Sequence, residues 1–150
     1  MFIQTLTDCY LKRLNKNAKE PFKASESAAA YDLFACIDNP ITIKPHQTIL
    51  VGTGWAIQPP KGFCVYIMAR SGLATKRGLR PANCVGLCDW DYRGEYKVAL
   101  HNDSEEAQTI QPNERIAQMM FVPFFSAEFK IVDELEDTER STGGFGSTGR

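Results

Sequence analysis

A short acidic and aromatic segment, residues 86–95, holds residue types that could activate a water molecule beside a ring-shaped ligand. Asp89 and Tyr92 stand in it between Gly86 and Gly94. A carboxylate can accept a proton from water, and an aromatic ring offers a flat contact surface. The same composition is ordinary for a tight turn, because Asp and Gly favour turns. The segment therefore predicts a hairpin between two strands that either holds a ligand or only reverses the chain.

Residues 70–72 have the composition of a phosphate site. Arg70, Ser71 and Gly72 follow an apolar run and begin a helical pattern over 71–77, which Gly78 would end. The free N–H groups at the start of a helix and a guanidinium both attract anions. The alternative is that Ser71 only caps the helix and Arg70 faces solvent.

The C-terminal residues 140–150 could also contact phosphates. They are mostly Gly, Ser and Thr around Phe145, and they follow an acidic run over 133–139. Glycines let the backbone approach a ligand closely, and Ser147 and Thr148 can donate hydrogen bonds to phosphate oxygens. An aromatic ring among glycines is expected to cover something flat. The alternative is an ordinary flexible linker.

Two further polar residues are weaker candidates when taken singly. Asp32 could contact a metal-bound water or could cap a turn. Gln118 could donate to a phosphate or could be the outward residue of an alternating strand.

Short apolar runs must position these residues. Such runs, separated by Pro, Gly and Asn turns, are typical of an all-β sandwich or barrel. The expected strands cover 41–43, 48–51, 55–57, 63–68, 97–100, 116–122 and 129–132. We expect one domain over 1–150, with a β core over 1–135, one short helix, and a flexible glycine-rich tail over 136–150 that closes over an active site.

Composition excludes several classes of function. The chain has 150 residues, 43% of them hydrophobic, and a net charge of −1, which gives no general attraction to nucleic acid or to an anionic membrane. No apolar run approaches the ~20 residues of a membrane span, and the N-terminus lacks a secretory pattern. Five cysteines without a C-x-x-C pair, and two histidines, favour free thiols over a zinc cluster. We expect a cytoplasmic protein.

Five segments resemble, in order, the five motifs of the deoxyuridine triphosphate nucleotidohydrolase (dUTPase) family of the homotrimeric type. They are Ala29 to Leu33, Arg70 to Ala74, Asn83 to Gly94, Glu114 to Gln118, and Arg140 to Gly149. The resemblance implies a β jelly roll and a homotrimer whose active sites are shared between subunits. It also implies hydrolysis of dUTP to dUMP and pyrophosphate with Mg²⁺, which supplies a dTMP precursor and keeps uracil out of DNA.

The resemblance also implies roles for residues of the third motif. Asp89 would hold and deprotonate the attacking water. Asn83 and the nearby backbone would read the uracil edge, and Gly86 belongs to the same substrate-binding set. Tyr92 would pack against the deoxyribose, where a 2′-hydroxyl would clash.

The other motifs would hold the phosphates and the base. By resemblance, the phosphate-binding residues would be Arg70, Ser71, Gln118, Arg140, Ser147 and Thr148. Phe145 would cover the base, and Gly72 and Gly146 belong to the same substrate-binding set. Asp32 would touch waters of a Mg²⁺ ion that the substrate's own phosphates mainly hold.

The chain departs from the family pattern at a few positions. The family usually has Gly where Ala30 stands, Pro where Ala69 stands and Gly where Ser141 stands, and Trp90 is bulky. The enzyme alternative is the related dCTP deaminase, which shares the jelly roll and the trimer. The non-enzyme alternative is a nucleotide sensor or capsid-like jelly roll without turnover. Asp89 and the glycine-rich tail favour the dUTPase over both.

Overall fold

The computed structural model describes residues 8–144, which form eleven β-strands and one α-helix. The elements are β1 (Tyr10–Arg13), β2 (Phe22–Lys23), β3 (Tyr31–Phe34), β4 (Ile41–Ile43), β5 (Thr48–Gln58), β6 (Phe63–Met68), α1 (Ser71–Arg77), β7 (Leu79–Pro81), β8 (Val85–Cys88), β9 (Glu95–Asn102), β10 (Gln108–Ile110) and β11 (Arg115–Pro123). The expected all-β fold with one short helix is confirmed. The two runs expected at 48–51 and 55–57 are parts of one long strand, β5.

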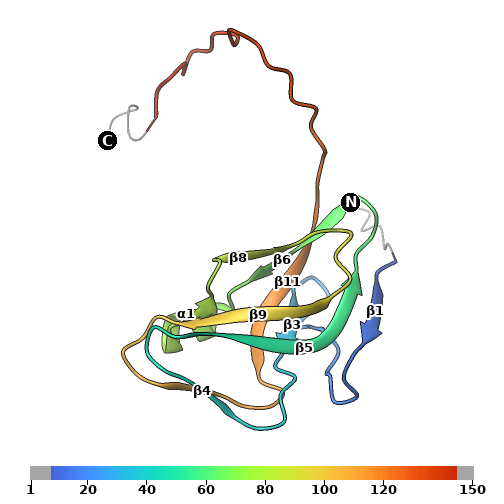
Figure 1. Ribbon diagram of the computed structural model, residues 1–150, viewed down its shortest axis with the longest axis vertical. Helices are drawn as coiled ribbons and strands as arrows, with labels where there is room; N and C mark the ends of the chain where they lie inside the picture. The colour runs from blue at the N-terminus through green and yellow to red at the C-terminus, as the bar shows by residue number, and fades with distance from the viewer. Residues whose placement is uncertain (1–7, 145–150) are drawn as a thin grey trace.

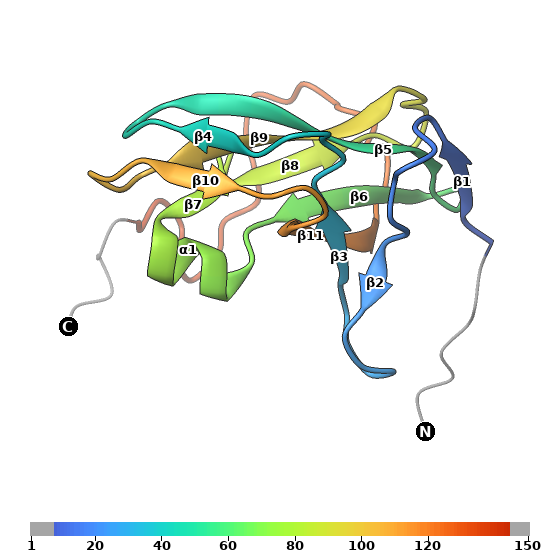
Figure 2. The same ribbon diagram turned by 90° about the horizontal axis from the view of Figure 1, so that it is seen from below.

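Two antiparallel sheets pack against each other, and a small one lies at their side (Figures 1 and 2). One sheet has the strand order β1-β5-β9-β7 and the other β2-β3-β11-β6-β8, while β10 pairs with β4. The first and last strands of each order remain edges, so neither sheet closes on itself. In Figure 2 the two larger sheets lie one above the other, with α1 at one end.

The core lies between these two sheets. Along β9, Tyr96, Val98 and Leu100 are at most 1% exposed, while Lys97 between them faces solvent. Successive side chains of a strand point to opposite faces, so this alternation turns one face of β9 inward. Val65 on β6 is also fully buried. The apolar faces of both layers thus supply the burial that stabilises the fold.

The predicted hairpin over residues 84–100 is wrong. β8 pairs with β6, with Gly86 opposite Ile67, whereas β9 pairs with β5 and β7. Residues 89–94 therefore carry the chain from one sheet to the other. Local apolar patterning gives two strands here, but each strand's partner is chosen by burial against residues distant in the sequence.

Helix α1 covers the predicted residues, but its N-cap lies one residue before the predicted cap. Arg70 is the N-cap, with φ −83° and ψ 129°, and makes no side-chain cap hydrogen bond. Ser71 is the first helical residue, so its prediction as the cap is wrong; its carbonyl accepts a hydrogen bond of 2.8 Å from the Thr75 hydroxyl. Gly78 ends the helix in the left-handed region at φ 65°, as expected of a C-terminal glycine.

Residues 124–144, here called the C-terminal segment, run away from both sheets (Figure 1). The strand expected at 129–132 is absent from it: Phe129 and Ile131 are 93% and 101% exposed. An alternating apolar run becomes a strand only where another edge pairs with it, and this segment meets none within the described part of the chain.

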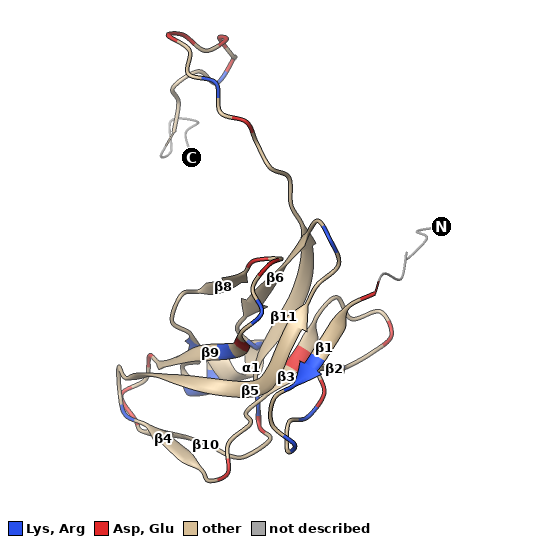
Figure 3. Ribbon diagram, turned by 45° about the vertical axis from the view of Figure 1, so that its right-hand side comes forward, with Lys and Arg blue, Asp and Glu red and all other residues tan. Residues whose placement is uncertain are grey.

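Charged positions are mixed over the body, as Figure 3 shows, in keeping with a net charge of −1. Over residues 8–144, no helix has both the length and the apolar character needed to cross a membrane. All five cysteines are free thiols.

Candidate functional site

A cavity of about 400 Å³ opens between the two main sheets. Four residues singled out in the sequence line it together: Asn83, Gly86, Asp89 and Tyr92. Asn83 precedes β8, Gly86 lies on it, and the other two stand on the connection from β8 to β9. The crossover between sheets, rather than a hairpin, is what brings these side chains to one cavity.

Asn83 lies against Gly86 at one side of the cavity. A methyl group at Gly86 would come within 3.3 Å of both Asn83 Nδ2 and Ile67 Cβ. Glycine therefore lets the Asn83 amide lie close to the β8 backbone. The turn before it is tight, because the Val85 amide donates to the Asn83 carbonyl at 2.6 Å and Cys84 has a φ of 61°. The arrangement presents an amide side chain beside backbone groups, which suits reading a polar ring edge.

Tyr92 forms another side of the cavity. Its hydroxyl donates to the Glu95 carbonyl oxygen at 3.1 Å, and its ring centroid lies 6.0 Å from that of Tyr96. The side chain crosses directly over Gly94, where an added Cβ would be 2.4 Å from the Tyr92 hydroxyl oxygen. Tyr92 remains 45% exposed, so part of the ring is available to a ligand.

Asp89 is an exposed carboxylate at the cavity wall. The Tyr92 amide donates to the Asp89 carbonyl oxygen at 3.2 Å, which fixes the turn between them. The neighbouring Cys88 is half-buried, and its burial, together with the charge of Asp89, raises the pKa of its thiol to about 11. Cys88 therefore stays protonated near neutral pH.

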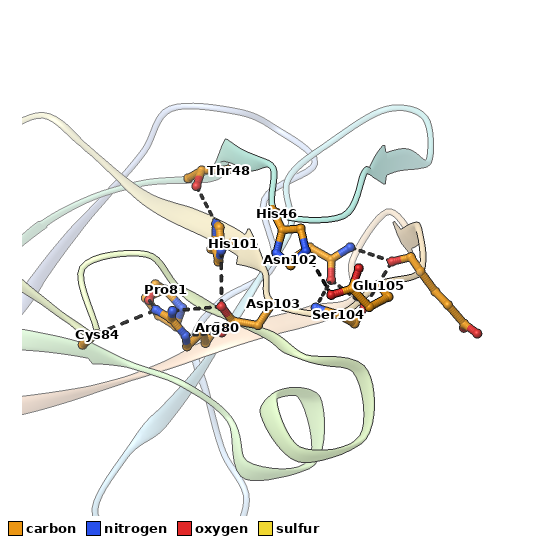
Figure 4. Close-up of polar contacts among 11 residues, drawn as sticks. His46, Thr48, Arg80, Pro81, Cys84, His101, Asn102, Asp103, Ser104 and Glu105 are labelled. Carbon is orange, nitrogen blue, oxygen red and sulfur yellow. Dashed lines mark hydrogen bonds and ion pairs between the residues drawn. The ribbon is translucent and has the colours of Figure 1, made fainter.

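The turn that carries Asn83 is supported from outside by Arg80 (Figure 4). Arg80 forms a two-pronged ion pair with Asp103, with Nη2 donating to Oδ1 at 3.0 Å, and its Nη1 donates to the Pro81 carbonyl at 3.1 Å. His101 Nε2 lies 3.3 Å from the same Asp103 carboxylate. The hydrogen bond from Arg80 holds the pKa of Asp103 below its usual value.

A second group of predicted residues gathers around Asp32 on β3. Arg70 Nε donates to Asp32 Oδ1 at 2.8 Å, and Arg115 Nη1 donates to Asp32 Oδ2 at 3.1 Å. Asp32 is 8% exposed, so two guanidinium groups balance a buried carboxylate. Gln118 lies opposite Asp32 in the register of β11 and β3, and its side-chain amide donates to the Ala69 carbonyl at 2.8 Å.

Neither Arg70 nor Gln118 lines the cavity between the sheets. Ser71 and Gly72 stand with Arg70 at the start of α1, also outside the cavity lining. A methyl group at Gly72 would meet nothing within 4 Å in the described part of the chain. The chain's own packing therefore gives no reason for glycine at this position.

The C-terminal candidates stand apart from both groups. Arg140 Nε donates to the Gly143 carbonyl at 2.9 Å, within the C-terminal segment. Phe145, Gly146, Ser147 and Thr148 lie outside the described residues.

Two residues in the neighbourhood were missed. Arg115 is the second partner of Asp32, and only the strand register reveals that pairing. Glu95 lines the cavity, and its side chain accepts a hydrogen bond from the Gly54 amide at 2.9 Å. Its position directly after Gly94 was the only available signal, and nothing in the sequence connects it to Gly54.

Over residues 8–144, no three His, Cys, Asp or Glu side chains converge on a point where a metal ion could sit. Both oxygens of Asp32 already accept a hydrogen bond from an arginine. A carboxylate oxygen has a second lone pair, so Asp32 fits contact with a metal-bound water better than direct ligation.

Known proteins with similar sequences and folds agree on one family. The sequence model of the dUTPase family matches residues 16–149. A deoxyuridine 5'-triphosphate nucleotidohydrolase of Hydrogenobaculum sp. is 46% identical over 139 residues, covering 93% of this chain and 96% of that protein. One of Aeromonas salmonicida is 48% identical over 132 residues, covering 87% and 86%. The structure of the Staphylococcus bacteriophage 80alpha dUTPase G164S mutant with dUpNHpp has a TM-score of 0.83 at 26% identity, over 97% of this chain and all of that one. The chain belongs to the dUTPase family.

Proposed function

We propose that this protein hydrolyses dUTP to dUMP and pyrophosphate. The observation that carries the proposal is the cavity shared by Asn83, Gly86, Asp89 and Tyr92. An amide beside the β8 backbone, an aromatic wall and a carboxyl group are what recognition of a deoxyuridine and activation of water require. The names of the bacterial relatives fit the same reaction.

Asp89 is the general base of this reaction. Its carboxylate accepts a proton from the attacking water as the water oxygen bonds to the α-phosphorus. The bond from that phosphorus to the bridging oxygen breaks, and pyrophosphate leaves with the electron pair. General-base assistance contributes about 10²–10⁴ in rate, and positioning and electrostatic stabilisation supply the rest.

Asn83 and Tyr92 provide the selectivity. The Asn83 amide offers both a donor and an acceptor to the uracil edge, and an amide held in that one orientation would mismatch the amino group of cytosine. Tyr92 packs against the deoxyribose, where the extra hydroxyl of a ribose would collide with its ring. The Tyr92 hydroxyl is held by the Glu95 carbonyl, and the Asn83 side chain lies beside Gly86.

The phosphates are bound by the second group, Arg70, Ser71, Gly72 and Gln118. Because this group lies outside the cavity of its own chain, we propose that each site combines groups from different subunits of a homotrimer. Asp32 would contact waters of a Mg²⁺ ion held mainly by the substrate's phosphates, and such an ion would supply positive charge against the phosphate groups. Arg70 adds positive charge at a position fixed by its bond to Asp32.

The tail beyond residue 136 closes over a site once substrate is bound. In this proposal Arg140, Ser147 and Thr148 contact the triphosphate, while Phe145 and Gly146 cover the base. Closure would exclude water from all but the attack position. The C-terminal segment lies free of its own body, as this exchange requires (Figure 1). The free thiols are compatible with a reducing cytoplasm.

The reaction is tested by measuring pyrophosphate release with Mg²⁺ from dUTP, UTP, dCTP and dTTP, with ammonia followed in parallel. Release from dUTP alone would support both the reaction and its selectivity. Ammonia from dCTP would assign a deaminase instead. Tight binding of dUTP without turnover would assign a sensor.

The role of Asp89 is tested by Asp89→Asn with Asp91→Asn as the matched control. Both residues are exposed acids on the same connection, but only Asp89 lines the cavity. Asp89→Asn should lower turnover about 10²-fold or more and change dUTP binding less than about tenfold. Asp91→Asn should stay near the wild type. Equal effects of the two would remove Asp89 from the role of base.

Shared sites are tested by mixing two inactive variants, Asp89→Asn and Arg70→Ala, and refolding them together. If each site takes these residues from different subunits, about a quarter of the sites in random trimers regain both. If both residues serve the same site from one chain, no activity returns. The mass in solution should correspond to about three chains.

A further inference from the structure

The pairing of β5 with β9 is interrupted directly beside the cavity. The register is regular as far as Gly52 opposite Lys97, and then shifts so that Ala56 lies opposite Glu95. Residues 53–55 of β5 therefore face Tyr96 alone. Such a bulge removes ladder hydrogen bonds and leaves backbone groups that need other partners.

Side chains replace the lost ladder bonds. The Gly54 amide donates to Glu95 Oε1 at 2.9 Å, and the buried Thr53 hydroxyl donates to the Tyr96 carbonyl at 2.7 Å. The Glu95 carboxylate fits beside Gly52, where an added Cβ would lie 2.4 Å from Oε1. Glu95 thus fills the bulge as an acceptor of the right length.

The bulge itself has little freedom to move. Gly54 has a φ of 75°, which favours glycine, and an added Cβ there would lie 2.6 Å from the Ala18 side chain. Its carbonyl accepts the Leu14 amide at 2.8 Å. The Gly54 amide is consequently a fixed point to which the Glu95 side chain is tied.

Glu95 holds Tyr92 with its other polar group. The Tyr92 hydroxyl donates to the Glu95 carbonyl oxygen at 3.1 Å, and both residues line the cavity. One residue therefore joins the rigid bulge of β5, through its carboxylate, to the aromatic wall, through its carbonyl.

We propose that Glu95 is the positioning residue that sets how far the Tyr92 ring reaches into the cavity, and so sets the discrimination between deoxyribose and ribose. This inference rests on the proposed function, because Tyr92 must face the sugar. Glu95 acts through Tyr92 and should affect choice of sugar more than rate.

Two substitutions separate the effect of the length of the Glu95 side chain from the effect of its charge. Glu95→Gln keeps the side-chain length and an acceptor oxygen for the Gly54 amide but removes the charge. Glu95→Asp keeps the charge but is one methylene shorter. The measured quantity is the ratio of kcat/KM for dUTP to that for UTP, together with kcat for dUTP alone.

Glu95→Asp should lower the dUTP/UTP ratio about tenfold, while kcat for dUTP falls less than about threefold, because a displaced Tyr92 admits the 2′-hydroxyl. Glu95→Gln should keep the ratio within about twofold. Lys97→Met is a further test of charge, since it removes the ammonium group 3.5 Å from the Glu95 carboxylate and keeps most of the apolar part of this cavity-lining side chain; it should keep the ratio. A ratio that follows charge, lost in Glu95→Gln and kept in Glu95→Asp, overturns the proposal.

Hydrogen exchange of the Gly54 amide gives a readout that does not depend on turnover. It should be slow in the wild type and in Glu95→Gln and fast in Glu95→Asp. If exchange is fast in Glu95→Asp but its dUTP/UTP ratio is unchanged, the bond from the Gly54 amide to Glu95 exists but does not position Tyr92. That result overturns the inference. If the wild type does not hydrolyse dUTP, the proposed function fails, and the preference for binding dUMP over UMP replaces the ratio as the test of Glu95.

Discussion

Asp32 and Arg70 are joined by an ion pair in which Arg70 Nε donates to Asp32 Oδ1 at 2.8 Å, linking the middle of β3 to the residue that caps α1. Arg115 occupies the other carboxylate oxygen. Asp32 is 8% exposed, so its carboxylate depends on both arginines for hydrogen bonds. This pair fixes the direction of the Arg70 side chain before any phosphate is present.

Asp32→Asn should therefore lower the free energy of unfolding by about 1–2 kcal/mol, a value discounted because Arg70 and Arg115 are partly exposed. Urea unfolding measures it, with the exposed Asp38→Asn as the control. Phosphate binding should weaken as well, since Arg70 loses its fixed direction. Unchanged stability would mean that the two arginines are held by other contacts.

Gly72→Ala should separate stability from activity. The added methyl group meets nothing in the described part of the chain, and Ala favours a helix over Gly, so stability should rise by about 0.5–1 kcal/mol. If the empty space belongs to a phosphate or to another subunit, dUTP turnover should fall at least about tenfold. Thermal unfolding and pyrophosphate release measure the two effects. If Gly72→Ala is more stable and keeps full turnover, Gly72 has no role in substrate binding.

Gly94→Ala should displace Tyr92, because the new Cβ would lie 2.4 Å from the Tyr92 hydroxyl oxygen. We expect the dUTP/UTP ratio of kcat/KM to fall, with hydrolysis of UTP appearing. Tyr92→Phe is the variant for comparison, because it keeps the ring and removes only the hydrogen bond from the hydroxyl to the Glu95 carbonyl. A wild-type ratio in Gly94→Ala would show that the ring can move without consequence.

Alkaline pH should destabilise the protein through Cys88. Burial raises the pKa of its thiol from 9.0 to about 11, so the folded chain holds this proton after the unfolded chain has released it. The unfolded state then binds fewer protons, and the free energy of unfolding falls as pH rises from about 9 to about 11. Cys88→Ser removes the titration without removing the small polar side chain. The difference between the two pH curves of urea unfolding should be flat below pH 9 and slope above it.

Helix and strand bounds were predictable where the neighbouring residues in the sequence determine them. Gly78 marks the end of α1, and the apolar run at 63–68 is β6 with the predicted bounds. Phe129 and Ile131 carry the same alternating signal yet remain exposed, because a strand needs a partner edge and local patterning does not reveal one.

The sequence does not predict how the candidate site residues are grouped in space. Asp89 and Tyr92 lie in one cavity as expected, although through a crossover between sheets instead of a hairpin. Arg115 beside Asp32, and Gly54 beside Glu95, join residues far apart in the chain. Those contacts follow from strand register and from a bulge, which are properties of the packed sheets rather than of any local segment.

Because residues 89–94 cross from one sheet to the other, the width of the cavity depends on the distance between the two sheets. Gly86 belongs to the sheet that contains β8, whereas Glu95 and Tyr96 belong to the sheet that contains β9. A small change in the apolar core that lets one layer slide over the other would alter the width of the cavity without touching its lining. A core substitution too small to change the melting temperature should therefore already change the affinity for the nucleotide.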